Sequence, residues 1–122
     1  MKDDDYKKMI DMLIMATVGN KIEWRENAKP TGSYETSVAG CGIKIWTDYD
    51  IQFDDTSYSI SLANPDGRVF STYSYNEADN TEEYQHLGTL YNAIRDMVYR
   101  ITESENLILN GLRNMTENKL SN

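Results

Sequence analysis

The stretch from residue 82 to residue 118, EEYQHLGTLYNAIRDMVYRITESENLILNGLRNMTEN, decides the fold of this chain. Its apolar residues recur at intervals of three and four, which is the helical period. Plotted at about 100° per residue they form one stripe, made of Leu87, Leu90, Ile94, Met97, Ile101, Ile108, Leu112 and Met115. Asn80 or Thr81 is the expected N-cap, and Glu82 and Glu83 follow in the first turn. The pattern predicts a helical segment over 82–118.

The length of this segment has a consequence for assembly. A continuous helix over these residues is about 50 Å long, whereas a compact domain of this size is about 35 Å across. The helix would overhang its domain, and the simplest surface to bury the overhanging stripe is the same helix of a second chain. We therefore expect a coiled-coil-like oligomer, at least a dimer. The alternative is a break near Ser104, because residues 102–105 match a capping box and Gly111 weakens the helix interior.

Upstream of this segment the period of the pattern changes. Residues 1–18 predict a short helix, with helical spacing from Asp3 and a stop at Gly19 and Asn20. Between 21 and 75 the chain is rich in β-branched and aromatic residues, which predicts an antiparallel meander of five or six strands. The expected strands are 21–25, 34–38, 42–47, 49–53, 58–62 and 68–75, and Pro and Gly mark turns at 29–32 and 64–67. The expected fold class is α+β, in a single domain spanning 1–122.

Composition excludes several classes of protein. The chain has 122 residues, with 12 Lys and Arg against 20 Asp and Glu, so its net charge is -8. Such an acidic surface disfavours binding of a long nucleic acid. One Cys and one His rule out an internal disulfide, a structural zinc site and a His cluster for a metal. The acidic start and the short apolar run at 12–16 predict a cytoplasmic protein that does not enter membranes.

No catalytic constellation is visible, and we expect no cofactor. His86 has no sequence signal that places Cys41 or a serine beside it. Gly40 and Gly42 lack the third glycine and the helix of a dinucleotide fingerprint. A group of aspartates around one turn could pair as acid and base or bind a cation, although a solvated loop is favoured; they are Asp48, Asp50, Asp54 and Asp55.

The arginines of the long segment carry the sharper signal. Arg95 and Arg113 fall on one helix face at about 100° per residue, whereas Arg100 lies nearer the edge of the apolar stripe, where it could reach a partner chain. Amide and hydroxyl groups share the face of Arg95 and Arg113, from Asn92, Thr102, Asn106, Asn110, Tyr91 and Tyr99. Arginine suits bidentate recognition of phosphate. The alternative is an ordinary solvated face, which Glu117 supports.

Aromatic residues of the sheet could complete such a site. Trp24 and Arg25 point to opposite faces of one expected strand, and Arg68 and Phe70 share a face of another. A ring beside guanidinium groups offers what a nucleotide needs, a stacking surface for the base and donors for the phosphates. The competing interpretation of Trp24 is a core residue.

The order of a short helix, a small meander and a long helical segment, with 90-LYNAIR-95 early and 112-LRNM-115 late, resembles the phage anti-Thoeris sponge proteins of the first family described. The resemblance implies a decorated coiled-coil oligomer that binds and sequesters a cyclic ADP-ribose signal without cleaving it. It implies ligand contacts near the subunit interface from an aromatic, an amide and arginines. The matching candidates are Phe70 or Trp24, Asn92, Arg95 and Arg113, with Tyr91 beside them and Arg100 as a weaker candidate.

Two other function classes remain open at the level of sequence. An acidic chain could imitate DNA phosphates and block a host defence nuclease through carboxylates such as Asp48, Asp50, Glu82 and Glu83. A hydrolase that uses the aspartates is a third possibility. The leading hypothesis is the non-enzymatic sponge, in which Arg95 and Arg113 meet the pyrophosphate of one ligand.

Overall fold

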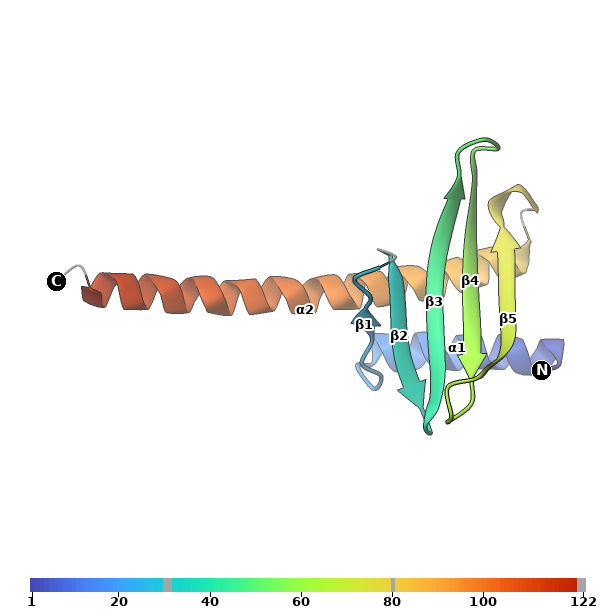
Figure 1. Ribbon diagram of the computed structural model, residues 1–122, viewed down its shortest axis with the longest axis horizontal. Helices are drawn as coiled ribbons and strands as arrows, with labels where there is room; N and C mark the ends of the chain where they lie inside the picture. The colour runs from blue at the N-terminus through green and yellow to red at the C-terminus, as the bar shows by residue number, and fades with distance from the viewer. Residues whose placement is uncertain (30–31, 80, 121–122) are drawn as a thin grey trace.

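The structure, a computed structural model, describes residues 1–29, 32–79 and 81–120 (Figure 1). Its elements follow one another as helix, sheet and helix. They are α1 (Asp3–Val18), β1 (Arg25–Glu26), β2 (Ser33–Val38), β3 (Cys41–Asp50), β4 (Asp55–Ala63), β5 (Val69–Asn76), the short 3-10 helix η1 (Glu77–Asp79) and α2 (Glu82–Leu120). The predicted α+β class, with a short first helix, an antiparallel sheet and a long last helix, is confirmed.

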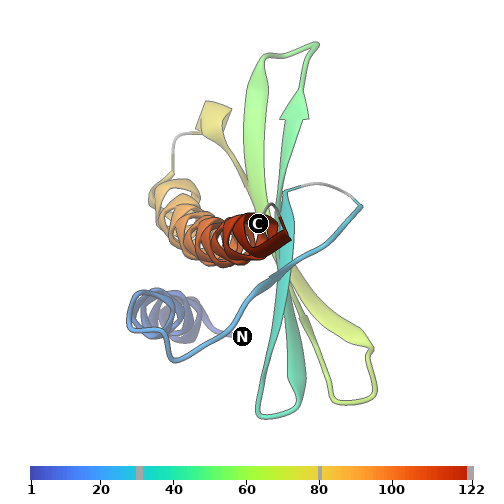
Figure 2. The ribbon, with the colours of Figure 1, turned by 90° about the vertical axis from the view of Figure 1, so that its left-hand side faces the viewer.

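The sheet is a meander in which each strand pairs antiparallel with the next, in the order β1-β2-β3-β4-β5. Alternation along the strands sends one set of side chains toward the helices, as Ile43 and Ile45 on β3 do, opposite Leu62 and Ile60 on β4. Both α1 and α2 cover this same face, and none of the described helices lies on the other face of the sheet (Figure 2). The molecule therefore has two layers, with its core between the sheet and the helices.

The first helix is fixed by its apolar face and by one buried polar contact. Tyr6, Ile10 and Leu13 are buried between α1 and the sheet. The Thr17 hydroxyl donates to the backbone oxygen of Leu13 at 2.7 Å and accepts from the indole Nε1 of Trp24 at 3.0 Å. Trp24 is thereby held in the core with 3% of its surface exposed. The helix stops as predicted, with Asn20 in the left-handed conformation at φ 57.

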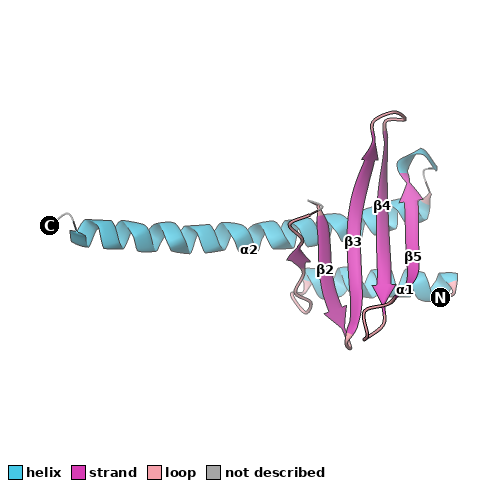
Figure 3. Cartoon of the chain, in the orientation of Figure 1, coloured by secondary structure: helices cyan, strands magenta, loops and turns pink. Residues whose placement is uncertain are grey.

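The last helix runs without a break. Its N-cap is Thr81, whose hydroxyl accepts from the backbone N–H of Tyr84 at 3.2 Å; Asn80, the alternative cap, lies outside the described residues. The helix continues through Ser104 and Gly111 to Leu120, so a helix pair is not formed. Figure 3 shows its C-terminal half extending beyond the edge of the sheet.

Two predicted strands are wrong. Of the predicted stretch 21–25 only Arg25 belongs to a strand, β1, which ends at Glu26, because the preceding residues lead Trp24 into the core between helix and sheet. The stretches 42–47 and 49–53 are not two strands. One strand, β3, runs on to Asp50, and Ile51 and Phe53 lie in the turn after it with 86% and 72% of their surfaces exposed. The Asp50 carboxylate makes that turn by accepting from the backbone N–H of Gln52 at 2.9 Å.

The turn predicted at 64–67 is confirmed. Gly67 has a positive φ of 91, and its N–H donates to the backbone oxygen of Asn64. The turn predicted at 29–32 contains Pro30 and Thr31, which lie outside the described residues.

Candidate functional site

The candidate site lies where α2 leaves the sheet. Up to Ile94 the apolar stripe is covered by the chain's own sheet and by α1, and Leu87, Leu90 and Ile94 have no exposed surface. From Tyr99 to Glu117 every side chain is exposed. We call residues 99–117 the overhang of α2. Within it the apolar residues are 43% to 72% exposed, and they are Ile101, Leu107, Ile108, Leu109, Leu112 and Met115.

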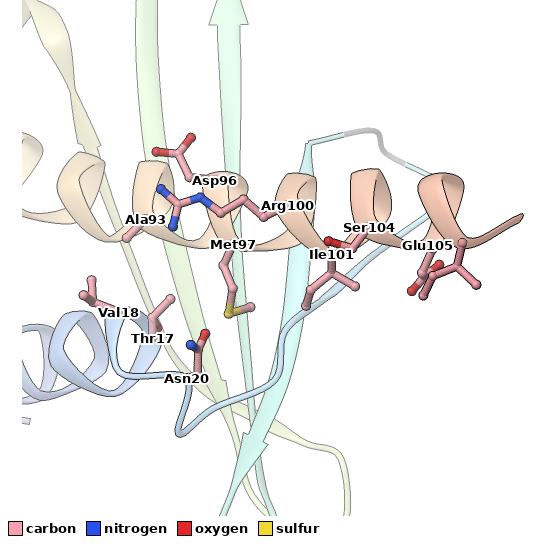
Figure 4. Close-up of a pocket in the computed structure, with 11 residues that line it drawn as sticks. Thr17, Val18, Asn20, Ala93, Asp96, Met97, Arg100, Ile101, Ser104 and Glu105 are labelled. Carbon is pink, nitrogen blue, oxygen red and sulfur yellow. The ribbon is translucent and has the colours of Figure 1, made fainter. Parts of the chain in front are cut away.

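A groove opens at the base of the overhang, beside the C-terminal end of α1. Its volume is about 580 Å³, and α1 and the residues after it contribute Thr17, Val18 and Asn20. The floor on α2 is apolar, with polar groups beside it, and the α2 residues are Ala93, Asp96, Met97, Arg100, Ile101, Ser104, Glu105 and Ile108. Figure 4 shows Met97 and Ile101 pointing to the side of α1 and Asn20 facing them from below. The groove continues the core of the domain along the apolar stripe.

Arg100 lies on the wall of this groove. Its side chain runs back along α2 toward Ala93 and Asp96 (Figure 4). It is exposed and forms no ion pair within 4.0 Å in the described part of the chain. Its guanidinium group is therefore available at the edge of the stripe, where the sequence places it.

Arg95 lies about 140° around α2 from Arg100, near enough to Tyr34 of β2 to act on it electrostatically. Its side chain is 57% exposed, and its closest carboxylate is that of Asp96, with Nε and Oδ1 separated by 3.9 Å. Burial raises the pKa of Tyr34 to about 12, and the positive charge of Arg95 acts against this rise. Burial also raises the pKa of Tyr91, again opposed by Arg95. Arg95 is thus a weakly paired cation beside two buried tyrosines.

Arg113 is far from Arg95 along the same helix. The two residues are separated by 18 positions, which corresponds to about 27 Å at 1.5 Å per residue. A pyrophosphate spans only a few ångström, so the two guanidinium groups of one chain cannot both bind it. The hypothesis of one ligand held by both arginines of the same chain is wrong in that form. Arg113 is exposed and makes no ion pair within 4.0 Å among the described residues.

The structure does not bring the predicted sheet aromatics to these arginines. Trp24 is a core residue, as its burial and its bond to Thr17 show, so its ring faces are not open to a ligand. Phe70 is 59% exposed, but it borders an apolar groove against Met9 and Met12 of α1, and no residue of α2 lines that groove.

Two predicted helix residues have partly internal roles. Tyr91 is buried, donates through its hydroxyl to the backbone oxygen of Gly32 at 2.9 Å, and packs edge-on against Tyr34 with ring centroids 5.6 Å apart. Asn92 is half-buried on the neighbouring face. Of these two residues, Asn92 is therefore the better placed to contact a ligand.

The sequence placed Tyr99 on the face of Arg95 and Arg113, but it was not chosen as a ligand-binding candidate. It is 62% exposed and follows Arg95 by four positions, so the two side chains are neighbours on the surface of α2. The spacing alone could have indicated this aromatic and cationic pair. No sequence pattern indicates the groove beside α1, because that groove depends on where α1 ends relative to α2.

The aspartates around the turn between β3 and β4 form hydrogen bonds within the chain. Asp50 caps the turn, Tyr49 and Asp54 share a hydrogen bond, and Asp55 accepts from the backbone N–H of Ala78 at 2.9 Å. His86 pairs with Asp11 at 2.6 Å and links α2 to α1. Among the described residues no three His, Cys, Asp or Glu side chains are grouped so that they could hold a metal ion.

None of the described helices is both long and apolar enough to cross a bilayer. Comparisons with protein-family models, with curated proteins and with solved structures find no match to this chain.

Proposed function

We propose that this chain is a non-enzymatic sponge, an oligomer that binds a cyclic ADP-ribose-type nucleotide and keeps it from a bacterial defence effector. The observation that carries the proposal is the overhang of α2, which presents Arg100 and Arg113, each without an ion pair among the described residues, beside an exposed apolar stripe. The stripe needs a second chain to cover it, and the arginines need an anion. A sequestering protein requires both a stable assembly and a tight site, and it requires no catalytic group.

The chemistry of the arginine face suits a small nucleotide better than a polymer. Arg95 offers planar donors for phosphate, and Tyr99 beside it offers an exposed ring for stacking of a base. Asn92, half-buried one turn earlier, can read a ribose hydroxyl or a base edge. The net charge of -8 repels a long polyanion, while a pair of local cations can still hold one pyrophosphate.

Under this proposal the protein acts in the cytoplasm of an infected bacterium and is encoded by the phage. The alternative of a DNA mimic has less support, because the carboxylate of Asp50 accepts from a backbone N–H of its own turn and that of Asp55 accepts from the backbone N–H of Ala78 in η1. A mimic would need its carboxylates free to imitate phosphates.

The test is binding without turnover. Cyclic ADP-ribose made by a TIR-domain enzyme is added to the purified protein, thermal stability is measured, and the ligand is recovered after heat denaturation. At 100 times its dissociation constant the ligand raises the free energy of unfolding by about 2.7 kcal/mol. If the ligand produces no thermal shift, the proposal is contradicted. Recovery of a chemically altered ligand would indicate an enzyme.

A matched pair of variants locates the site. Arg113→Ala should weaken binding about 10-fold or more, because it removes a charge-assisted hydrogen bond worth about 1.5–3 kcal/mol. Arg68→Ala is the control, since Arg68 is an exposed arginine in the β4–β5 turn, next to Asp66 and distant from α2 in the fold. Unchanged affinity in Arg113→Ala would remove Arg113 from the site, and equal losses in both variants would indicate a non-specific charge effect.

A further inference from the structure

The hairpin of β3 and β4 projects from the sheet and carries exposed apolar side chains at its end. β2 begins opposite Trp46 and β5 ends opposite Ser57, so the hairpin continues past both neighbouring strands. Figure 1 shows it reaching beyond the other strands. We call residues 51–54 the hairpin tip. In it Ile51 and Phe53 are 86% and 72% exposed, an unusual cost for side chains that gain stability when water is removed from them.

The hairpin tip is held in one conformation by its own polar groups. The Asp50 carboxylate accepts from the backbone N–H of Gln52 at 2.9 Å and from that of Phe53 at 3.4 Å. Asp54 has a left-handed backbone at φ 49, and its carboxylate accepts from the hydroxyl of Tyr49. A segment that is ordered before binding loses less conformational entropy on binding. The two apolar side chains therefore stand on a pre-organised support.

The opposite end of the sheet has an apolar groove against α1. Its volume is about 730 Å³, within the range of about 300–1,000 Å³ that is typical of binding pockets. The charged side chains that line it are Asp5 and Lys8. Its walls are otherwise mostly apolar, and they include Met9, Met12, Val38, Ile43, Leu62 and Phe70. Met12 and Phe70 are 65% and 59% exposed, so the groove is open to a partner.

The hairpin tip cannot reach the groove of its own chain. β3 begins at Cys41, which lines the groove, and ends at Asp50, next to the tip. These ends are about 30 Å apart at about 3.3 Å per residue. Figure 2 shows the tip at one end of the sheet and the turns after β2 and β4 at the other end. Only a second copy of the chain can therefore bring an apolar tip to this groove.

Charge favours this occupant over a lipid surface. Residues 48–55 contain no Lys or Arg, and their four carboxylates belong to Asp48, Asp50, Asp54 and Asp55. An anionic membrane would repel such a tip. The walls of the groove carry one cation and one anion, Lys8 and Asp5, so they add no net charge to oppose the tip. Lys8 can also meet one of the carboxylates at the rim.

We propose that the hairpin tip of one copy docks in the groove of a second copy, with Ile51 and Phe53 of the partner subunit against Met12 and Phe70. The contact is head-to-tail, and contacts of this kind build a ring or an open chain of subunits. An interface built around two inserted side chains is at the small end of protein interfaces, so association depends on concentration. The contact uses no residue of α2 and is independent of the overhang and of any nucleotide.

Crosslinking tests which surfaces meet. The wild-type chain has one cysteine, Cys41, in the groove. Gln52→Cys in a Cys41→Ser background has its only cysteine at the exposed tip and keeps both apolar side chains there. We expect a short bismaleimide to link the two proteins, carrying different tags, when they are mixed, and to link neither protein to itself. Self-links in either protein alone would show contact between like surfaces, and absence of a link in the mixture would exclude the contact; either result overturns the proposal.

Complementation tests the head-to-tail geometry. Phe53→Asp and Met12→Asp each put a carboxylate on one side of the contact, at positions exposed enough to leave folding intact by circular dichroism. Each should weaken association, measured by sedimentation, about 10-fold or more, because a charge would be buried in an apolar groove. A mixture of the two variants should form pairs, since one supplies an intact tip and the other an intact groove.

Met15→Asp is the matched control, because Met15 lies on α1 with 73% of its surface exposed and does not line the groove. Its association should equal that of the wild type. Wild-type association in Phe53→Asp or Met12→Asp, an equal loss in Met15→Asp, or no pairs in the mixture would each overturn the proposal. Binding of the wild type to phosphatidylcholine vesicles that is lost in Phe53→Asp would assign the tip to a lipid surface instead.

Discussion

The two halves of α2 carry the same apolar pattern in different surroundings. In the first half, Leu87, Leu90 and Ile94 lie fully buried against the sheet and α1. In the second half, Ile101, Ile108 and Leu112 continue the stripe with about half of their surface or more exposed to solvent. A stripe of this kind on an isolated helix of about 20 residues contributes little to helix stability in water. The comparison supports our proposal that the overhang is an interaction surface covered by a second chain.

The largest expected effect comes from comparing one substitution in each half of α2. Ile94→Ala removes methyl and methylene groups from a site with no exposed surface and should lower the free energy of unfolding by about 2–5 kcal/mol. Ile108→Ala, at a 64% exposed site, should leave the unfolding of the dilute protein within about 0.5 kcal/mol and should weaken association instead. Urea denaturation followed by tryptophan fluorescence, together with sedimentation, measures both. A similar loss of stability in both variants would contradict the division of α2.

A second expected effect concerns the tyrosines that only the first half of α2 buries. Burial raises the pKa of Tyr34 from its ordinary value of 10.0 to about 12. The unfolded chain therefore releases this proton first, and the stability that Tyr34 contributes is complete below pH 10 and is lost as the pH rises toward 12. The loss is at most about 3 kcal/mol by linkage, at about 1.4 kcal/mol for each pKa unit. Thermal unfolding between pH 9 and pH 12 should show it.

Two variants sharpen this pH prediction. Tyr34→Phe should flatten part of the decline, since it removes the ionisable hydroxyl. Tyr99→Phe removes an exposed hydroxyl of the overhang and serves as the control. A decline of unchanged steepness in Tyr34→Phe would assign the pH dependence to other groups.

The smallest expected effect uses the two glycines of α2. A Cβ at Gly88 would lie 2.9 Å from Cε2 of Tyr58, so Gly88→Ala should cost about 1–3 kcal/mol by overpacking. Gly111 has nothing within 4 Å of such a Cβ, and Gly111→Ala should stabilise the helix by about 0.5–1 kcal/mol. Circular dichroism during thermal unfolding measures the helical content of each. Opposite signs are expected, and the same sign in both would indicate that the overhang is packed as the domain is.

Much of the fold follows from local pattern. The helices 1–18 and 82–118, the strand-rich middle and the turn at 64–67 all have short-range causes, namely apolar periodicity, caps and turn residues, and the structure contains each of them. The stretches 21–25 and 49–53 were wrongly predicted as separate strands. Alternation of polar and apolar residues also occurs where a chain crosses the edge of the core or extends a hairpin. Trp24 is the clearest example, since its indole donates to Thr17 of α1 and lies in the core between helix and sheet.

The candidate site was harder to predict from the sequence than the fold. Helical spacing put Arg95 and Arg113 on one face but did not take account of the 18 positions that separate them. It assigned Phe70 to their neighbourhood, whereas β5 places that ring over α1. Tyr99 was placed on the arginine face but was not chosen as a ligand-binding candidate, although its spacing from Arg95 is local. Contacts between distant segments depend on which face of the sheet the helices cover, and no single segment encodes that choice.

By itself the sequence determined that α2 is a long amphipathic helix with an apolar stripe and an arginine face, because helical periodicity is a property of neighbouring residues. Only the tertiary structure decided where the domain ends along that helix. The sheet and α1 cover the stripe as far as Ile94 and leave it open from Ile101, since the span of the sheet is shorter than the helix. That boundary separates the core of the protein from the surface through which we propose it to assemble.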